Sequence, residues 1–398
     1  MTPTSLAICV DGLGEHWLGG VNYFRNLLLV FDAAADPDLR LHLLTDNPAF
    51  LADLQLSPRV QVHRVGMLKR KSMSWVLRKA LHVLTGRDVL LLSRLRRLDV
   101  RAVVFSYVAG ARSAGMQCVP WIPDFQFKHL PGLFPAATVA AEEERAHRFV
   151  RVADGLVLSS QSACEDAVKF FGADRQRLHV VRFAPKVDFA PLLCTTRRDE
   201  VLARYGIDRP YVFLPNQYWK HKNHQLVADA LRLLRQAQRD RPLVISTGKT
   251  ADLRDERYFG DFETTLRVGQ LDDSYRILGV IPREDMLVLL AHCMAVLNPS
   301  RFEGWSTTVE EAKALGKRLL VSDIPVHREQ VAALPDAQSF GTDDPARLSD
   351  LLGNLQAEYG GGDTTAHPPQ PRPELFASFS KQYIALLKRL VRPDGVKA

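Results

Sequence analysis

The segment between residues 298 and 311 has the residue types that could bind a phosphate-bearing ligand. Two carboxylates, Glu303 and Glu311, stand with seven residues between them, where an apolar strand-like run gives way to a helical pattern. Three hydroxyl residues fall at the expected cap and first turn of that helix: Ser306, Thr307 and Thr308. Free backbone N–H groups and the helix dipole at such a terminus favour an anion such as a diphosphate.

The spacing of the two carboxylates suits a nucleotide-sugar. At roughly 1.5 Å per residue, Glu311 lies about 7 Å deeper along the helix than Ser306. One carboxylate can then bind hydroxyls on one side of the diphosphate, and the other can bind hydroxyls on the far side. The alternative is that Ser306 only caps the helix and that both acids are solvated.

A second loop, residues 215–224, also joins a strand to a helix and has two lysines. Lys220 and Lys222 offer positive charge where a strand end meets the same predicted crevice. A departing diphosphate without a metal ion needs such charge. The alternative is an ordinary basic turn, because most lysines are solvated.

Two loops in the first half of the chain also follow strands. In residues 11–20, Trp17 stands where a dinucleotide fingerprint has its third glycine, which argues against that site, while Gly20 could allow close backbone approach to a ligand. Asp124 and His129 follow another strand, and either could position or deprotonate a hydroxyl. For Asp124 the alternative is a Pro-Asp turn.

No metal or other cofactor is expected. The Asp-Pro-Asp at residues 36–38 falls in a turn after the first helix, and His and Cys show no ligand spacing. The 5 cysteines are scattered and form no Cys-x-x-Cys pair, so neither a zinc site nor a disulfide framework is expected, and a reducing cytosol fits best.

The elements that must position these residues alternate between short apolar runs and amphipathic helices. Strands are expected at residues 6–10, 41–44, 102–105, 119–122, 156–158 and 179–183, and then at 211–214, 243–246, 276–278, 294–297 and 318–321. Helices are expected near residues 20–34, 136–152, 162–171, 224–238 and 374–391. Residues 184–200, with their prolines and charges, are expected to form a linker.

This alternation predicts an α/β fold of two doubly wound, Rossmann-like domains facing a cleft. We expect an N-terminal acceptor-side domain over residues 1–190 and a nucleotide-sugar-binding domain over residues 200–372. The terminal helix, within 374–398, is expected to pack back on the first domain. Ligands in such sheets bind beyond the carboxyl ends of the strands, where the strand order reverses.

Composition excludes several classes of protein. Of 398 residues, 46% are hydrophobic and 24% are charged, as in ordinary globular chains rather than disordered ones. No apolar run reaches the length of a bilayer span, and the first residues do not read as a signal peptide. The net charge is +7, but residues 66–101 alone contain ten basic residues against Asp88 and Asp99.

That basic segment, Lys69–Arg101, has apolar residues interleaved with its charges from Trp75 to Leu84. The pattern is typical of an interfacial helix on an anionic membrane surface. The alternative is a solvated basic face. Nucleic acid is disfavoured, because Trp75 is the one aromatic residue in the segment and cannot build a stacking platform alone.

The chain resembles the retaining glycosyltransferases of family four, which have the GT-B architecture and a Glu-x7-Glu motif. The similarity is specific from Phe302 to Lys317, where the sequence is F-E-G-W-S-T-T-V-E-E-A-K-A-L-G-K, and continues at residues 321–329. It extends upstream to residues 276–282 and the lysine loop, and more weakly to Gly20 and residues 121–126.

The resemblance implies a role for each matching residue. Glu311 would bind the ribose hydroxyls, Glu303 would contact the transferred sugar, and Lys222 would neutralise the diphosphate. The amides of residues 306–308 would support the diphosphate. Ile281 and its neighbours would border the base through their backbone. Gly20 would approach the phosphates.

The chain departs from the family in two places. An arginine is common five residues before the lysine, and Gln217 stands there, so Lys220 is the candidate to supply its charge. A histidine is common where Pro123 stands, just before Asp124. His129 and His16 are the candidates to replace it on the acceptor side.

The implied reaction is metal-independent transfer of a sugar from a nucleotide-diphosphate donor to a glycan or lipid-linked acceptor, with retention of configuration. Lys222, Glu303 and Asp124 are the catalytic candidates.

The setting would be bacterial-type polysaccharide or lipopolysaccharide assembly, cytoplasmic or peripheral on the inner face of the membrane. GDP, UDP, dTDP and ADP stay open as the nucleotide. The rival functions are a nucleotide-sugar epimerase of the same architecture and a non-catalytic basic protein that binds nucleic acid or membranes.

Overall fold

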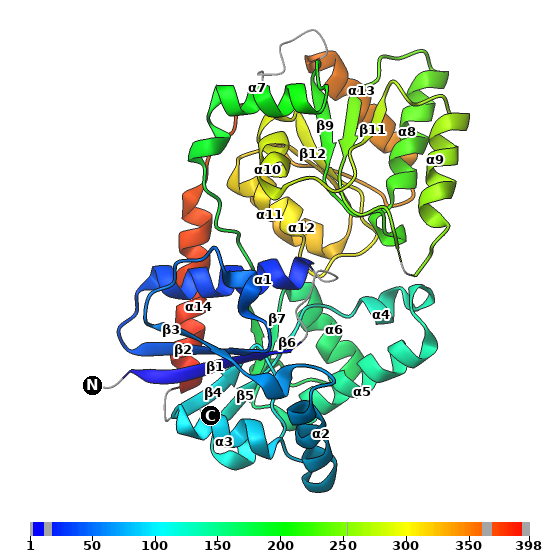
Figure 1. Ribbon diagram of the computed structural model, residues 1–398. Helices are drawn as coiled ribbons and strands as arrows, with labels where there is room; N and C mark the ends of the chain where they lie inside the picture. Colours follow the sequence, from blue (N-terminus) through cyan, green and yellow to red (C-terminus); the bar gives the residue numbers. More distant parts are fainter. Residues whose placement is uncertain (1–2, 12–17, 253, 360–367, 392–398) are drawn as a thin grey trace. The chain divides into compact units, whose positions relative to one another are not determined.

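A computed structural model describes the chain apart from residues 1–2, 12–17, 253, 360–367 and 392–398 (Figure 1). His16 and Trp17 therefore lie outside the described residues. The chain divides into two compact units. The first comprises Met1–Pro131, Pro135–Lys186 and Glu374–Ala398, and the second comprises Gly132–Phe134 and Val187–Pro373.

The first unit is built on parallel strands. They are β1 (Thr4–Val10), β2 (Leu39–Thr45), β3 (Val60–Arg64), β4 (Val100–Val104), β5 (Gln117–Val119), β6 (Trp121–Ile122), β7 (Leu156–Leu158) and β8 (Leu178–Val180). One sheet has the order β3-β2-β1-β4-β5, and a second has the order β6-β7-β8. Pro120 separates the two sheets, because it has no N–H to donate to a neighbouring strand, while its carbonyl accepts from Val157 N at 2.9 Å.

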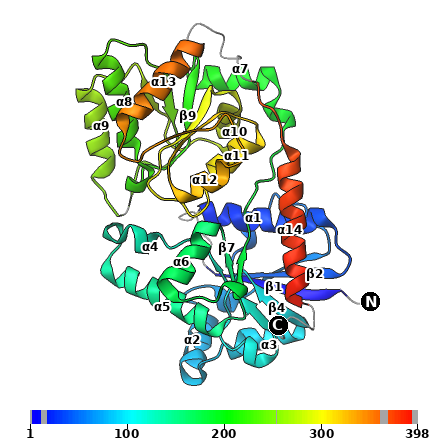
Figure 2. The same cartoon turned by 180° about the vertical axis from the view of Figure 1, so that it is seen from behind.

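Helices pack around the two sheets of this unit. They are α1 (Leu18–Ala34), α2 (Met73–Thr85), α3 (Val89–Arg97), α4 (Gln126–His129), α5 (Ala136–Val152), α6 (Gln161–Phe171) and α14 (Pro373–Val391). The buried leucines of α3 pack against Ala7 and Val103 of the sheet. On α14, Tyr383 packs against Phe105 with ring centroids 5.6 Å apart, and Ser380 Oγ donates to the Val30 carbonyl of α1 at 3.4 Å. Figure 2 shows α14 crossing α1.

The second unit is built on one doubly wound parallel sheet. Its strands are β9 (Tyr211–Leu214), β10 (Leu243–Ser246), β11 (Tyr275–Ile277), β12 (Ala295–Asn298), β13 (Leu319–Ser322) and β14 (Gln338–Phe340). All pairings are parallel, and the order is β11-β10-β9-β12-β13-β14. The chain winds outward from β9 and then returns to β12 beside it, so the strand order reverses between these two strands.

Two layers of helices enclose that sheet, as Figure 1 shows. They are α7 (Thr195–Arg204), α8 (His224–Gln236), α9 (Tyr258–Val268), α10 (Arg283–His292), α11 (Thr307–Ala314), α12 (Pro325–Val331) and α13 (Pro345–Tyr359). Apolar residues of α8, α9 and α13 form one core cluster, and those of α7, α10 and α11 form another. Because both faces are covered, the central strands are uninterrupted apolar runs, which is why they were predictable.

The structure confirms the predicted fold class and corrects several elements. The linker predicted over residues 184–200 is wrong from Thr195 onward, because α7 begins there. The buried apolar residues of α7, Val201 and Leu202, follow the charged run from which the linker was predicted. The edge strands β3 and β14 were not predicted, since each buries few side chains. The strand predicted over residues 119–122 is divided at Pro120.

Candidate functional site

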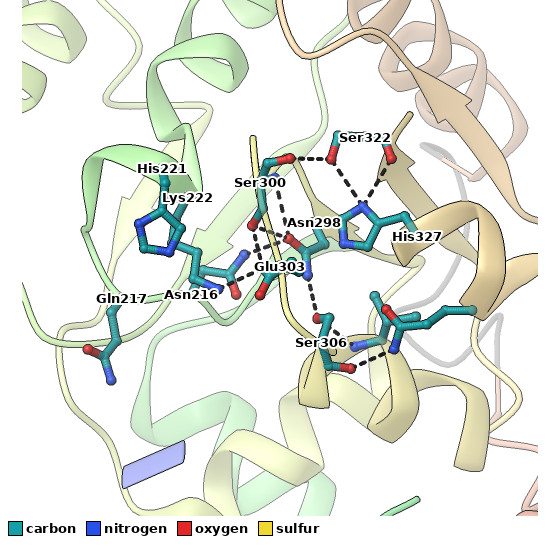
Figure 3. A network of polar contacts seen from close by, with 12 residues as sticks. Asn216, Gln217, His221, Lys222, Asn298, Ser300, Glu303, Ser306, Ser322 and His327 are labelled. Atoms are coloured by element: carbon teal, nitrogen blue, oxygen red, sulfur yellow. Dashed lines mark hydrogen bonds and ion pairs between the residues drawn. The ribbon is translucent and has the colours of Figure 1, made fainter. Parts of the chain in front are cut away.

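Two loops meet at the point of the second unit where the strand order reverses. The first follows β9 and ends in a short 3₁₀ helix, Lys220–Lys222, before α8. The second follows β12 and leads into α11. Since β9 and β12 are adjacent parallel strands, their carboxyl ends bring the two loops together. The predicted lysine and glutamate loops are therefore neighbours (Figure 3).

A buried ion pair joins these two loops. Lys222 Nζ lies 2.6 Å from Glu303 Oε1, and the two side chains are only 15% and 9% exposed. Ser300 Oγ also lies 2.6 Å from Glu303 Oε1. Burial alone would raise the pKa of Glu303, but the Lys222 ammonium, His327 and the hydrogen bonds from Lys222 and Ser300 lower it to about 2. Glu303 is therefore a carboxylate at neutral pH, able to accept hydrogen bonds but not to donate a proton.

Asn298 connects the glutamate loop to the start of α11. Its Nδ2 donates to Ser306 Oγ at 2.7 Å, and its Oδ1 accepts from Asn216 Nδ2 at 3.2 Å. Ser300 Oγ lies 2.7 Å from the same Oδ1, so its one proton can serve either Asn298 or Glu303. All the members of this network are buried. A buried, mutually hydrogen-bonded set of this kind fixes the positions of its members.

Hydrogen bonds of Asn223 and His221 connect the lysine loop to neighbouring loops. Asn223 has a left-handed backbone with φ 59°, which asparagine tolerates well, and its Nδ2 donates to the carbonyls of Pro299 at 3.2 Å and Thr342 at 2.9 Å. The His221 carbonyl accepts from Arg301 N at 2.7 Å. These bonds fix the position of one loop relative to the other, so Lys222 and Glu303 are in place before any ligand binds.

Ser306 does cap α11. Its Oγ accepts from Val309 N at 3.3 Å as well as from Asn298, and its carbonyl accepts from Gln330 Nε2 at 2.9 Å. The Ser306 hydroxyl therefore caps the helix, as the alternative interpretation of the sequence expected, and also bonds to Asn298. That alternative does not apply to Glu303, which is buried rather than solvated. Thr307 and Thr308 begin the helix, so their amides lie at the end where a helix dipole favours an anion.

His327, at the start of α12, was not predicted from the sequence and lies beside Glu303 in Figure 3. Its Nδ1 lies 3.0 Å from both the carbonyl and the Oγ of Ser322, and that hydroxyl donates to the Ser300 carbonyl. Nδ1 therefore donates to the Ser322 carbonyl. Burial lowers the pKa of His327 to about 4, so the ring is neutral and its Nε2, buried without a hydrogen-bond partner in the described part of the chain, is an acceptor.

Glu311 and Arg283 form a second ion pair. Arg283 Nη2 lies 2.6 Å from Glu311 Oε1, and the Glu311 side chain is 7% exposed. Arg283 opens α10, directly after the predicted base-bordering segment that contains Ile281. The sequence offered no reason to pair Arg283 with Glu311, because the two residues belong to different helices. Ile281 is half-buried and packs against the core cluster of α7, α10 and α11.

Other predicted site residues make different contacts. Lys220 Nζ lies 3.2 Å from Asp255 Oδ2, and its side chain is 57% exposed. The Gln217 side chain points away from the network in Figure 3, while its carbonyl lies 3.2 Å from His224 Nε2. Only Lys222 of the two lysines is thus brought to Glu303.

Three of the predicted residues, Gly20, Asp124 and His129, lie in the first unit. Gly20 is buried in the first turn of α1. Asp124 Oδ1 accepts from Gln126 N at 2.9 Å, the turn contact that was its alternative. His129 Nε2 lies 2.7 Å from Asp166 Oδ2. Within the described residues, no group of three or more His, Cys, Asp or Glu side chains is arranged to hold a metal ion.

Comparisons with known proteins agree with this geometry. Residues 198–355 match the family model described as glycosyl transferases group 1. A D-inositol 3-phosphate glycosyltransferase from Xylanimonas cellulosilytica is 26% identical over 235 residues, 57% of this chain and 53% of that protein. The chain thus spans about half the length of the curated relative it matches.

Two solved structures resemble the whole chain. A glycosyltransferase from Rickettsia africae superposes with a TM-score of 0.66 at 13% identity, covering 97% of this chain and 94% of the other. HepE from Anabaena, in complex with UDP and glucose, superposes with a TM-score of 0.67 at 15% identity, covering 97% and 99%. At these identities the likeness establishes the fold, which is GT-B, as the resemblance implied.

Proposed function

Residues 198–355 match the family model of the group 1 glycosyl transferases, and on this basis we propose that the chain is a retaining, metal-independent glycosyltransferase. It moves a sugar from a nucleotide-diphosphate donor to a hydroxyl of a glycan or lipid-linked acceptor. The observation that carries the proposal is the buried Lys222–Glu303 pair at the reversal of strand order, 2.6 Å between Nζ and Oε1. A cation and a carboxylate held there can bind a diphosphate and a sugar together.

Lys222 binds the diphosphate in this proposal. Its ammonium is held at the carboxyl end of β9 and is shielded from water, so its charge acts on a phosphate with little screening. The amides at the start of α11, at Thr307 and Thr308, add to it. Lys220, which pairs with Asp255, contributes less direct charge. As the bond from the sugar to the phosphate breaks, these groups stabilise the charge that develops on the leaving oxygen.

Glu303 binds the sugar. Within the described residues, the hydrogen bonds to the Glu303 side chain from Lys222 and Ser300 both reach Oε1, so Oε2 can accept from sugar hydroxyls. Glu311, deeper on α11, binds the ribose hydroxyls and exchanges part of its pairing with Arg283 for them. The segment that contains Ile281 borders the base through its backbone.

The chemistry needs no protein nucleophile. The anomeric carbon leaves the diphosphate oxygen and bonds to the acceptor oxygen on the same face, and the acceptor proton passes to the departing phosphate oxygen. The protein supplies position and charge. A carboxylate with a pKa near 2, such as Glu303, cannot act as the acid, which agrees with this division of work.

The acceptor that we propose is a glycan on a lipid carrier, as in polysaccharide or lipopolysaccharide assembly, met at the inner face of a membrane. Among the described helices, none combines the length and apolar character that a bilayer span requires.

The donor is tested by thermal unfolding with UDP, GDP, dTDP or ADP in the presence of EDTA. UDP is the first probe, because the HepE structure contains it. A nucleotide at 100 times its dissociation constant adds about 2.7 kcal/mol of stability. We expect one of the four to raise the unfolding temperature of the wild type, with EDTA present. No shift with any of them contradicts the proposal.

The stereochemistry is tested by proton NMR of the first-formed product. Retention predicts the same anomeric configuration in the product as in the donor sugar. An inverted product contradicts the retaining mechanism but does not contradict the proposed donor site. Conversion of the donor to an epimeric nucleotide-sugar without any acceptor supports the epimerase instead.

A further inference from the structure

Helix α2 of the first unit has its apolar face toward solvent. Met73 is 90% exposed, Val83 and Leu84 are each 81% exposed, and Val76 and Leu77 are 55% and 54% exposed. None of the residues of α2 is buried. Large apolar side chains at such exposure, gathered on one element, mark a surface that binds something.

These side chains form one continuous stripe. At roughly 100° per residue, positions 73, 76, 77, 80, 83 and 84 fall within an arc of about 120° on the helix. The opposite side of α2 contains the half-buried residues, Trp75, Leu81 and His82. Arg78 also lies there, in an ion pair with Asp88 at 2.7 Å from Nε to Oδ2. The helix therefore contacts the protein through the side with Trp75, Arg78 and Leu81, and the stripe faces solvent.

Basic residues surround the stripe. Five of them are exposed: Lys69, Arg70, Lys71, Lys79 and Arg87. The nearest acid in the sequence, Asp88, is buried and paired with Arg78, so it does not offset this charge at the surface. The whole chain carries +7, and much of that excess gathers around α2.

The basic residues and the exposed apolar stripe of α2 together indicate what kind of partner binds this surface. A second copy of the chain on this face would bring two clusters of lysine and arginine together, which is repulsive. A nucleic acid would gain little from an aliphatic stripe, and Trp75 is half-buried against the protein. An anionic bilayer satisfies both features, because the stripe enters the acyl boundary while the basic residues meet the headgroups.

We propose that α2, with the basic residues 69–71, 79 and 87 around it, docks the protein on an anionic lipid surface. The stripe of residues 73–84 lies in the plane of the interface and buries its apolar side chains there. This surface belongs to the first unit and does not depend on the donor site of the second. The two proposals can therefore fail separately.

The test is co-sedimentation of the full chain with vesicles of phosphatidylcholine alone, or of phosphatidylcholine mixed with phosphatidylglycerol. We expect binding to the mixed vesicles that weakens as salt is raised. The triple variant Lys69→Glu, Arg70→Glu, Lys79→Glu should lose about a hundredfold in partitioning, because each basic residue is worth roughly fivefold near an anionic surface. Arg78 is left unchanged, since its reversal would break a buried ion pair.

A matched control makes the same change in charge elsewhere on the first unit. Arg151, Arg175 and Lys381 are exposed and distant in sequence from α2, so their replacement by glutamate should weaken binding far less. A second variant, Val83→Gln with Leu84→Gln, removes apolar area from the stripe without changing charge. We expect it to lose at least about tenfold in partitioning. Both α2 variants should still show the nucleotide-induced thermal shift.

Three results would overturn the proposal. One is wild-type binding that does not differ between the two kinds of vesicle. Another is an equal loss of binding in the α2 triple variant and its control. The third is a wild-type dimer that Val83→Gln with Leu84→Gln converts to a monomer, with no vesicle binding, because the stripe would then be an interface between two copies.

Discussion

At the scale of single residues, the central feature is a cation and a carboxylate that neutralise each other inside the protein. Lys222 and Glu303 are both nearly buried, and removing one partner leaves the other with an uncompensated charge. The same pairing holds the Lys222 side chain in the position where we propose that it binds a diphosphate. If the proposed function is correct, the Lys222–Glu303 pair contributes both to stability and to ligand binding.

Replacing Glu303 with glutamine separates binding of the nucleotide from transfer of the sugar. Glu303→Gln leaves the Lys222 ammonium without its counter-charge, so we expect about 3 kcal/mol lower stability by urea unfolding. A nucleoside diphosphate should bind at least as tightly as in the wild type, because the ammonium is released. Transfer should fall by about a hundredfold, mainly in kcat. Unchanged kcat would contradict the role of Glu303 at the sugar.

Glu311 is tested by a ligand that lacks the hydroxyls it is proposed to bind. The wild type should bind a nucleoside diphosphate at least about tenfold more tightly than its 2′,3′-dideoxy analogue, by calorimetric titration. In Glu311→Gln the affinity for the ribose form should fall and the difference between the two ligands should shrink. A difference that persists undiminished would place the ribose elsewhere.

At the scale of elements, the end of α11 shows how closely the second unit is packed. Gly316 follows the helix with φ 61°, and the segment around Gln370 pairs with the last turn, Gln370 N donating to the Leu315 carbonyl at 2.8 Å. A Cβ on Gly316 would lie 2.5 Å from the Gln370 carbonyl oxygen. The helix that bears Glu311 therefore has no room for a side chain at its end.

Gly316→Ala should lower the free energy of unfolding by more than about 2 kcal/mol, from the left-handed backbone and the contact with Gln370 together. Gly172→Ala is the matched control. Gly172 ends α6 with φ 63°, and a Cβ there meets nothing within 4 Å. The control should show only the backbone cost of about 1 kcal/mol. Equal losses in the two variants would mean that the Gln370 contact is unimportant.

The elements also show what the sequence could and could not predict. The runs at residues 211–214 and 294–297 are uninterrupted and apolar, so the strands and the loops with Lys222 and Glu303 after them were predictable. The contacts that complete the site were not. Asn298 reads as the end of a strand, and its bond to Ser306 depends on how the loop turns back. His327 lies on α12, which follows another strand, β13, and no local pattern places it beside Glu303.

At the scale of the whole molecule, buried histidines set how stability depends on pH. Burial lowers the pKa of His42 and His327 to about 4 and of His221 and His224 to about 3. In the unfolded chain each has a pKa near 6.5. As pH falls below 6.5, the unfolded chain therefore binds protons that the folded chain does not, and stability decreases.

Each such histidine should cost about 1.4 kcal/mol per pH unit between pH 6.5 and its folded pKa. Glu303 adds to the loss below its unfolded pKa near 4.5, since its folded pKa is lowered to about 2. Urea unfolding at a series of pH values should therefore show stability falling steeply from pH 6.5 to pH 5. Stability that is flat over this range would mean that these rings reach water in the folded protein.

The measurement that tests the account most directly is calorimetric titration of UDP, GDP, dTDP and ADP, with EDTA present, into three forms of the protein. The forms are the wild type, Lys222→Met, and the double variant Lys222→Met with Glu303→Gln, which removes the charge that the single change leaves uncompensated. Lys220→Met serves as the comparison for a neighbouring lysine.

We expect the wild type to bind at least one of the four nucleotides, both Lys222 variants to lose at least about tenfold in affinity, and Lys220→Met to lose less. Folded Lys222 variants that bind as tightly as the wild type, or a wild type that binds none of the four, would contradict the assignment of this site to a nucleotide-diphosphate donor.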